Sequence, residues 1–168
     1  VGSYSVYANY KAQIINTFII ENNIKNMCEL GCGDGNQLSL FIPITYYGYD
    51  ISSEVVEYNK KRFNDKKHFF STDFKEFNLA FFDLTLSLDV IFHLIEDEVY
   101  YEYMKNLFEL SDKFVIIYSP NENRNVNIHV KYRMFSNEVP ANFKLLKKID
   151  NPLKGNNTQS DFFIYIKE

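Results

Sequence analysis

The chain has 168 residues, of which 46% are hydrophobic and 24% charged, a composition typical of a folded globular protein and not of a disordered one. This length suits one domain, and the net charge of −4 opposes binding to a nucleic-acid duplex, whose phosphates need clustered lysine and arginine. The two cysteines, Cys28 and Cys32, are too few for a disulfide framework or a self-sufficient zinc site, so no metal is predicted.

Short apolar runs alternate with helical patterns from residue 25 onward, which is typical of a layered α/β sheet. The predicted strands cover residues 25–30, 46–50, 68–71, 83–88, 113–118, 143–149 and 161–167. The predicted helices cover residues 4–22, 36–41, 52–63 and 96–110, with a short turn over 135–139. Residues 121–127 are polar and predict a loop, and residues 151–160 predict the turn that joins the last two strands.

One domain with three functional parts follows from this order of elements. Residues 1–23 form an N-terminal helix that covers the cofactor, residues 24–120 the cofactor-binding half, and residues 121–168 the acceptor-side loop and the final pair of strands. No apolar run is long enough to span a bilayer, and the N-terminus lacks the apolar core of a signal peptide. We therefore expect a cytoplasmic protein without a membrane partner.

A glycine-rich turn directly after the first strand is the strongest chemical signal. Gly31, Gly33 and Gly35 let the backbone turn tightly and approach a ligand, and the helix expected behind them offers free N–H groups to an anionic group. Asp50 ends the next strand, where a carboxylate can accept hydrogen bonds from a ribose diol. The alternative is a plain surface loop followed by a surface acid. The G-x-G-x-G spacing differs from the G-x-G-x-x-G of dinucleotide folds, and no Walker lysine follows.

The run Glu29–Gln37 (ELGCGDGNQ) resembles motif I of class I S-adenosylmethionine-dependent methyltransferases. The likeness continues through residues 49–51, 72–74 and 82–94, and it extends over most of the chain. This resemblance implies a three-layer Rossmann-like sheet in the order 3-2-1-4-5-7-6 with strand 7 antiparallel, and S-adenosylmethionine as the cofactor. The run IHVKYRMFS at residues 128–136 also resembles a stretch found in short bacterial and phage methyltransferases.

The resemblance also implies roles for individual residues in binding the cofactor. Glu29 would orient the glycine loop, Asp50 would hold the ribose hydroxyls, and Asp73 would contact the adenine amino group. Ile51 and Phe74 would pack on the adenine ring, and the backbone of Leu88 would lie near the methionine end. The residues so assigned to the cofactor are Glu29, Gly31, Cys32, Gly33, Gly35, Asp50, Ile51, Asp73, Phe74 and Leu88.

Aromatic and basic side chains of the N-terminal helix are further candidates. Tyr10 and Lys11 are predicted to reach the cofactor pocket, whereas packing is the preferred interpretation for Tyr7. Tyr4 belongs to the same tyrosine series at the start of the helix. Cys28, in the middle of a strand, is interpreted as a small buried side chain.

Two groups are predicted on the acceptor side. His93, just after the fourth strand, is a candidate general base or acceptor-orienting residue, and the alternative is a histidine that only shapes the pocket. His129, Lys131 and Arg133 would share one side of an extended segment and suit a phosphate or carboxylate of the acceptor. The alternative is a solvated charged loop. His129 and Arg133 are accordingly grouped with His93 as catalytic candidates.

The predicted function is transfer of a methyl group to O or N of a small acceptor, possible examples being an anionic metabolite or a sugar precursor of glycans. Residues 88–91 (LDVI) lack the Asn/Asp-Pro-Pro-aromatic sequence of adenine and cytosine amino methyltransferases, which disfavours nucleic acid. A non-catalytic S-adenosylmethionine-binding partner of a larger complex is the alternative. A nucleotide-dependent oxidoreductase is a third hypothesis, which the glycine spacing disfavours.

Overall fold

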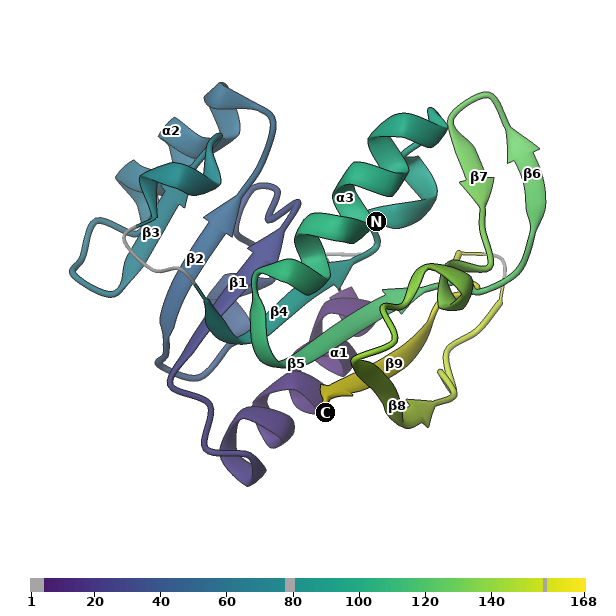
Figure 1. The fold of residues 1–168 in the computed structure, drawn as a ribbon. Coiled ribbons are helices and arrows are strands. Elements are labelled where there is room, and N and C mark those ends of the chain that lie inside the picture. Colours follow the sequence, from purple (N-terminus) through teal and green to yellow (C-terminus); the bar gives the residue numbers. More distant parts are fainter. Residues whose placement is uncertain (1–4, 78–80, 156) are drawn as a thin grey trace.

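A single seven-stranded sheet in the order β3-β2-β1-β4-β5-β9-β8 organises the computed structural model, which describes residues 5–77, 81–155 and 157–168 (Figure 1). Its strands are β1 (Asn26–Leu30), β2 (Thr45–Tyr49), β3 (His68–Ser71), β4 (Phe82–Leu88), β5 (Ser111–Ser119), β8 (Phe143–Ile149) and β9 (Asp161–Lys167). A separate hairpin consists of β6 (Arg124–Asn127) and β7 (Val130–Tyr132). The helices are α1 (Ser5–Glu21), α2 (Ser53–Arg62) and α3 (Asp97–Glu109), with 3-10 turns η1 (Leu38–Leu40), η2 (Phe74–Glu76), η3 (Ile91–His93) and η4 (Phe135–Glu138). Tyr4 and Asn156 lie outside the described residues.

The pairing of the strands confirms the predicted sheet. Strands β3, β2, β1, β4 and β5 are parallel neighbours, whereas β9 is antiparallel to both β5 and β8. Because the hairpin adds two strands to the numbering, β9 is the predicted antiparallel strand 7 and β8 is strand 6. The carboxyl ends of the parallel strands therefore meet at one edge, where ligands bind in open α/β sheets.

Two apolar clusters cover opposite faces of the sheet. On one face Ile15, Phe18 and Ile19 of α1 pack against strand residues such as Met27 and Leu86. On the other face α3 buries Met104, Leu107 and Phe108, and it crosses in front of the strands in Figure 1. Strands covered on both faces read as near-continuous apolar runs, which is why β4 and β5 could be predicted. Within the described ranges no helix has the length and apolar character needed to cross a bilayer.

The helix predicted over residues 36–41 is wrong. Only the 3-10 turn η1 forms there, so no long helix stands behind the glycine loop. The backbone N–H of Asn36 donates to the Asp34 carboxylate (3.0 Å), a local turn that competes with helical hydrogen bonding. Pro43 then limits the segment, because the chain must enter β2 at Thr45.

The loop predicted over residues 121–127 is wrong in part: residues 121–123 are irregular, but residues 124–127 form β6, which pairs with β7 in a hairpin. All four residues of β6 are exposed. Because neither face of the strand is buried, its sequence has no alternation of apolar and polar residues from which a strand could be predicted. Tertiary contacts support the hairpin instead: the ring of Tyr132 lies 6.0 Å from that of Phe92 in η3, and the Arg124 guanidinium lies 4.9 Å from the ring of Tyr132. The hairpin projects beyond the sheet, on the right in Figure 1.

Candidate functional site

The three glycines after β1 all adopt the left-handed backbone conformation, with φ of +78° at Gly31, +54° at Gly33 and +72° at Gly35. A Cβ on Gly31 would lie 2.6 Å from Val90 Cγ2, and one on Gly35 would lie 2.5 Å from Phe63 Cε2. A Cβ on Gly33 would meet nothing within 4 Å. The outer glycines thus allow close packing, while the middle one faces open space.

The end of β2 holds this loop in place. The backbone N–H of Gly33 donates to Asp50 Oδ2 (3.0 Å), and the N–H of Ser52 donates to Asp50 Oδ1 (3.0 Å). The Gly31 and Cys32 N–H groups donate to the Tyr49 carbonyl at 2.8 and 3.0 Å. Asp50 therefore fixes the loop with the same carboxylate that was predicted to hold a ribose.

Glu29 and Cys32 lie beneath the loop and are buried. Glu29 Oε2 accepts a hydrogen bond from the Tyr46 hydroxyl (2.7 Å). Burial raises the pKa of Glu29 to about 7, since the Tyr46 hydroxyl and the charge of Lys11 offset the loss of solvation only in part. Burial also raises the pKa of the Cys32 thiol, so this side chain stays protonated and packs as a small apolar group.

A first cavity of about 520 Å³ opens at the carboxyl ends of β1, β2 and β4. Four of the predicted cofactor residues line it: Gly31, Asp50, Ile51 and Phe74. The side chain of Ile51 is 85% exposed, and the ring of Phe74 is stacked on Tyr49 with centroids 3.8 Å apart. An exposed aliphatic side chain and an aromatic face beside a carboxylate suit a nucleoside.

The other predicted cofactor residues do not line the first cavity. Glu29, Cys32, Gly33, Gly35 and Leu88 belong to the loop and strands around it, and Asp73 is exposed with its carboxylate accepting from the Lys75 N–H (2.9 Å). Tyr10 packs against Phe162, and its buried hydroxyl has no hydrogen-bond partner among the described residues. The structure thus divides the predicted set into residues that line the cavity, residues of the glycine loop and its neighbouring strands, and two residues, Tyr10 and Asp73, that lie elsewhere.

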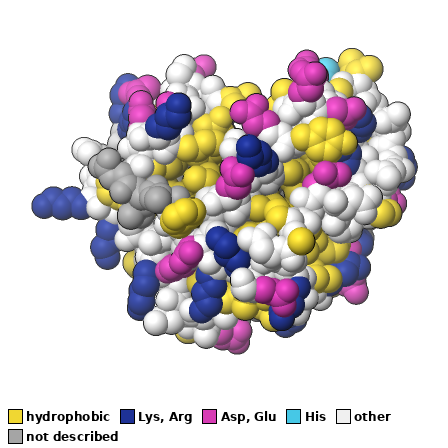
Figure 2. All heavy atoms as spheres, viewed as in Figure 1, with side chains coloured by type: hydrophobic (Ala, Val, Ile, Leu, Met, Phe, Trp, Pro, Cys, Tyr) yellow, Lys and Arg dark blue, Asp and Glu magenta, His cyan; other side chains and the backbone are white. Residues whose placement is uncertain are grey.

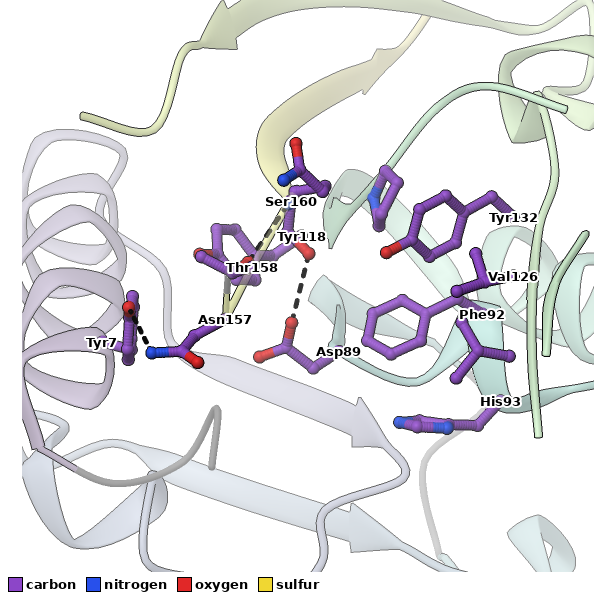
Figure 3. A pocket seen from close by; sticks show the side chains of 13 residues that line it. Tyr7, Asp89, Phe92, His93, Tyr118, Val126, Tyr132, Asn157, Thr158 and Ser160 are labelled. Carbon is purple, nitrogen blue, oxygen red and sulfur yellow. Dashed lines mark hydrogen bonds between the residues drawn. The ribbon is translucent and has the colours of Figure 1, made fainter. Parts of the chain in front are cut away.

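A second cavity of about 360 Å³ adjoins the first, and Asp89 and His93 line both (Figure 3). Its aromatic residues are Tyr7, Phe92, Tyr118 and Tyr132, and its amide and hydroxyl groups come from residues 157–160. In Figure 3 Asp89 points toward Tyr118 and Ser160, Phe92 and Tyr132 lie across the cavity, and His93 lies at its edge. Tyr7, for which packing was preferred, is therefore a cavity residue, with its hydroxyl 3.5 Å from Asn157 Nδ2.

Asp89 has an unusual backbone and a buried cation behind it. Its φ of +59° is left-handed, a conformation that a residue with a side chain rarely adopts and that often marks a functional site. The completely buried Lys11 places Nζ 2.8 Å from Asp89 Oδ2, and the Ser160 hydroxyl donates to Asp89 Oδ1 at 3.2 Å. Lys11 does not line the first cavity; it anchors Asp89 between the two cavities.

The basic run on the hairpin is directed away from both cavities. Lys131 Nζ and Arg133 Nη2 lie 2.6 and 2.7 Å from Asp97 Oδ1 at the start of α3, and they hold the pKa of Asp97 below its usual range. Arg133 is buried, donates to the carbonyls of Leu94 and Ile95, and lies 4.3 Å from the ring of Tyr100. These contacts favour a structural role for Arg133.

The two predicted histidines occupy different positions. His93 lines both cavities, and its Nδ1 lies 3.4 Å from the His129 carbonyl oxygen. His129 sits in the turn of the hairpin, where its backbone N–H donates to Asn127 Oδ1 (2.8 Å), and its side chain lines neither cavity. Only His93 of the three catalytic candidates therefore faces a place where an acceptor could bind.

Comparison with known proteins gives both a family and a fold. Residues 28–110 match the family described as "Methyltransferase domain". These residues are similar to a methyltransferase domain, and the strand order of the sheet is that of the class I methyltransferase fold. No curated protein sequence matches the chain.

Solved structures similar to this methyltransferase share its fold at low identity. The magnesium protoporphyrin IX methyltransferase ChlM from Synechocystis PCC 6803 with bound SAH is 14% identical, with a TM-score of 0.71 over 95% of this chain and 83% of that one. The N-methyltransferase NodS from Bradyrhizobium japonicum WM9 is 12% identical, with a TM-score of 0.74 over 95% and 93%. The small RNA methyltransferase HEN1 is 19% identical, with a TM-score of 0.72 over 96% of this chain and 25% of that one. These names include a porphyrin methyltransferase and a small RNA methyltransferase, so the shared fold does not tell which acceptor this chain methylates.

S-adenosylmethionine is the cofactor of this methyltransferase, and the first cavity fits it. The left-handed glycines give a cradle without side chains, and Gly33 faces open space. Asp50, Ile51 and Phe74 line this cavity, so a cofactor bound there would meet the carboxylate predicted for the ribose diol and the two side chains predicted for the adenine ring. The Asp50 carboxylate already accepts a hydrogen bond from the Gly33 N–H, so the glycine loop is held in this shape before a cofactor binds.

Several cavity residues were missed by sequence reasoning. Tyr103, on α3, lines the first cavity with its hydroxyl 2.8 Å from the Leu30 carbonyl oxygen and 2.7 Å from Ser87 Oγ, but a tyrosine in an amphipathic helix carries no distinguishing signal. Residues 157–160 have the composition of an ordinary turn. Asp89 did carry a signal, as an acid at the carboxyl end of a central strand, in the same position on β4 that Asp50 has on β2.

Proposed function

We propose that this methyltransferase acts on O or N of a small acceptor bound in the second cavity. The observation that carries the proposal is that the first and second cavities share Asp89 and His93, so that a donor in one would meet an acceptor in the other. The volume of about 360 Å³ is that of a small-molecule site.

The chemistry needs little more than alignment. S-adenosylmethionine supplies an electrophilic methyl group: an acceptor lone pair forms the new bond to carbon while the C–S bond breaks and its electron pair stays on sulfur. Holding the reacting atoms in line provides much of the acceleration in such a displacement. Asp50 and the glycine loop would position the donor, and the walls of the second cavity the acceptor. His93, which lines both cavities, would help to orient the acceptor or take its proton.

A small acceptor is favoured over RNA by the distribution of charge. On the face shown in Figure 2 acidic and basic side chains are interspersed, without a continuous basic surface. Lys131 and Arg133, which the sequence analysis expected on the acceptor side, are bound to Asp97. Nucleic-acid binding depends on unpaired lysine and arginine that can neutralise phosphates.

The test is to fill the second cavity without touching the first. Val126 in β6 lines the second cavity, whereas Ile128 in the adjacent turn is 81% exposed and lines neither. Release of S-adenosylhomocysteine is measured with a small-molecule acceptor library and with a small RNA. We expect turnover with small molecules that Val126→Trp abolishes and Ile128→Trp leaves unchanged, at unchanged S-adenosylhomocysteine affinity. Methylation of the RNA alone, or turnover insensitive to Val126→Trp, would refute the proposal.

A further inference from the structure

The charges around the second cavity differ from those that the basic run predicted. Among the described residues that line it there is one carboxylate, Asp89, and one histidine, His93, but no lysine or arginine. Lys11 lies behind Asp89 with no exposed surface, so it cannot reach a ligand without leaving its partner. An anionic acceptor would therefore enter a cavity that offers it a carboxylate and no cation.

The Asp89 carboxylate still has capacity to accept hydrogen bonds. A carboxylate has about four lone-pair sites, of which Lys11 uses one on Oδ2 and Ser160 one on Oδ1. The side chain is 18% exposed, and it lines the boundary of the two cavities. The left-handed backbone of Asp89 is held by its N–H, which donates to the Tyr118 carbonyl (3.0 Å). Asp89 is thus a fixed acceptor of hydrogen bonds at the boundary of the two cavities.

The walls opposite Asp89 are aromatic. Phe92 and Tyr132 face it across the cavity in Figure 3, and Tyr118 lies beside it. Aromatic faces are electron-rich, so they attract a cation or the edge of a ring and repel an anion. The carboxylate and the rings therefore select in the same direction.

We propose that the acceptor of this methyltransferase carries no negative charge and is an amine or alcohol whose N–H or O–H donates to Asp89, which makes Asp89 the residue that determines specificity. This inference rests on the proposed function, since it assumes that the second cavity binds the methyl acceptor. The preference of that cavity for an amine or alcohol over an anion can nevertheless be measured as binding, without turnover. It replaces the anionic acceptor that the basic run suggested.

The experiment measures the affinities of four probes that share one ring: benzylamine, benzyl alcohol, benzoate and benzyl phosphate. Each is titrated by ligand-observed NMR with and without saturating S-adenosylhomocysteine. We expect benzylamine to bind at least about tenfold more tightly than benzoate or benzyl phosphate, the ratio that one charge-assisted hydrogen bond supplies, with benzyl alcohol between them. Val126→Trp should remove the binding, which locates it in the second cavity.

Two variants then test the residue. Asp89→Asn should reduce the preference for benzylamine to threefold or less. Because this change leaves Lys11 buried without a partner, the double variant Lys11→Met/Asp89→Asn, which removes both charges, serves if the single variant is unfolded. Lys131→Ala is the matched control, since Lys131 binds Asp97 and lines neither cavity.

The outcomes separate this inference from the proposed function. Tighter binding of benzoate or benzyl phosphate, a preference that survives in both variants, or binding of none of the probes would overturn the inference. Failure to bind S-adenosylhomocysteine would instead refute the methyltransferase function. The probe affinities measured without S-adenosylhomocysteine would then still test the preference of the second cavity.

Discussion

The two cavities of this methyltransferase are built in different ways. One wall of the first cavity rests on consecutive units of strand and turn, in which Gly31 follows β1 and Asp50 follows β2, while residues of α3 supply another wall. The second cavity joins distant segments: Lys11 to Asp89, Asp89 to Ser160, and Tyr7 to Asn157. Local backbone requirements therefore define the cofactor side, and tertiary packing defines the acceptor side. The predictions below test that difference.

The glycine loop gives the largest expected effect, because a local backbone requirement cannot be relieved by packing elsewhere. Gly35→Ala combines left-handed strain with a clash against Phe63 and Asn59, so we expect a loss of about 2–5 kcal/mol in the free energy of unfolding. Gly33→Ala has the strain but open space, and should cost about 1–2 kcal/mol. Urea denaturation checks both, and equal losses would show that packing under Gly35 does not matter.

Glu29 should make the cofactor side sensitive to pH. Its pKa is raised from 4.5 to about 7 in the folded protein, so the folded state holds a proton that the unfolded state releases between those values. The contribution of Glu29 to stability is therefore complete below about pH 4.5 and is lost as pH rises through 7, by about 3 kcal/mol.

Glu29→Gln tests this dependence, because the amide stays neutral and still accepts from the Tyr46 hydroxyl. We expect the variant to be about 3 kcal/mol more stable than the parent at pH 8 and equally stable at pH 4.5, by urea denaturation across that range. Glu57→Gln, on the surface beside Lys60, is the control with no such trend. Parallel pH profiles for the parent and Glu29→Gln would contradict the account.

The basic run tests the acceptor side, with a smaller effect. Arg133→Ala removes hydrogen bonds to two backbone carbonyls and Asp97, and should cost about 2 kcal/mol of stability. Lys131→Ala removes a partly exposed ion pair and should cost about 0.5 kcal/mol or less. Thermal denaturation measures both changes. If either substitution weakened binding of benzoate and left stability unchanged, the run would be an anion site after all.

Most of the fold could be predicted because buried strands appear in the sequence as short, nearly continuous runs of apolar residues. The bounds predicted for β3, β8 and β9 agree with the structure, and Ser52, where the helix over 52–63 was predicted to begin, caps α2 by accepting from the Val55 N–H at 3.3 Å. The hairpin could not be predicted, since β6 is wholly exposed and depends on contacts with η3. The helix expected over 36–41 failed because a local turn at Asp34 replaced it.

In the candidate site, too, residues that depend on local sequence could be predicted and contacts between distant residues could not. Asp50 could be predicted because an acid at the end of the second strand needs only local context. The partnership of Lys11 with Asp89 could not, because nothing in a sequence shows that residues so far apart form an ion pair at 2.8 Å. The contacts of Arg133 could not be predicted either: alternation placed Arg133 on the same side as Lys131, but it did not reveal that Asp97 binds both.

The central claim is that the glycine loop and Asp50 hold S-adenosylmethionine in the first cavity, and a calorimetric titration with S-adenosylhomocysteine tests it most directly. We expect one site on the parent protein, an affinity weakened by about 1–3 kcal/mol in Asp50→Ala through loss of hydrogen bonds to its carboxylate, and an affinity within about twofold of the parent in Lys131→Ala. A folded protein that binds NADH and not S-adenosylhomocysteine, or an Asp50→Ala variant with unchanged affinity, would contradict the account.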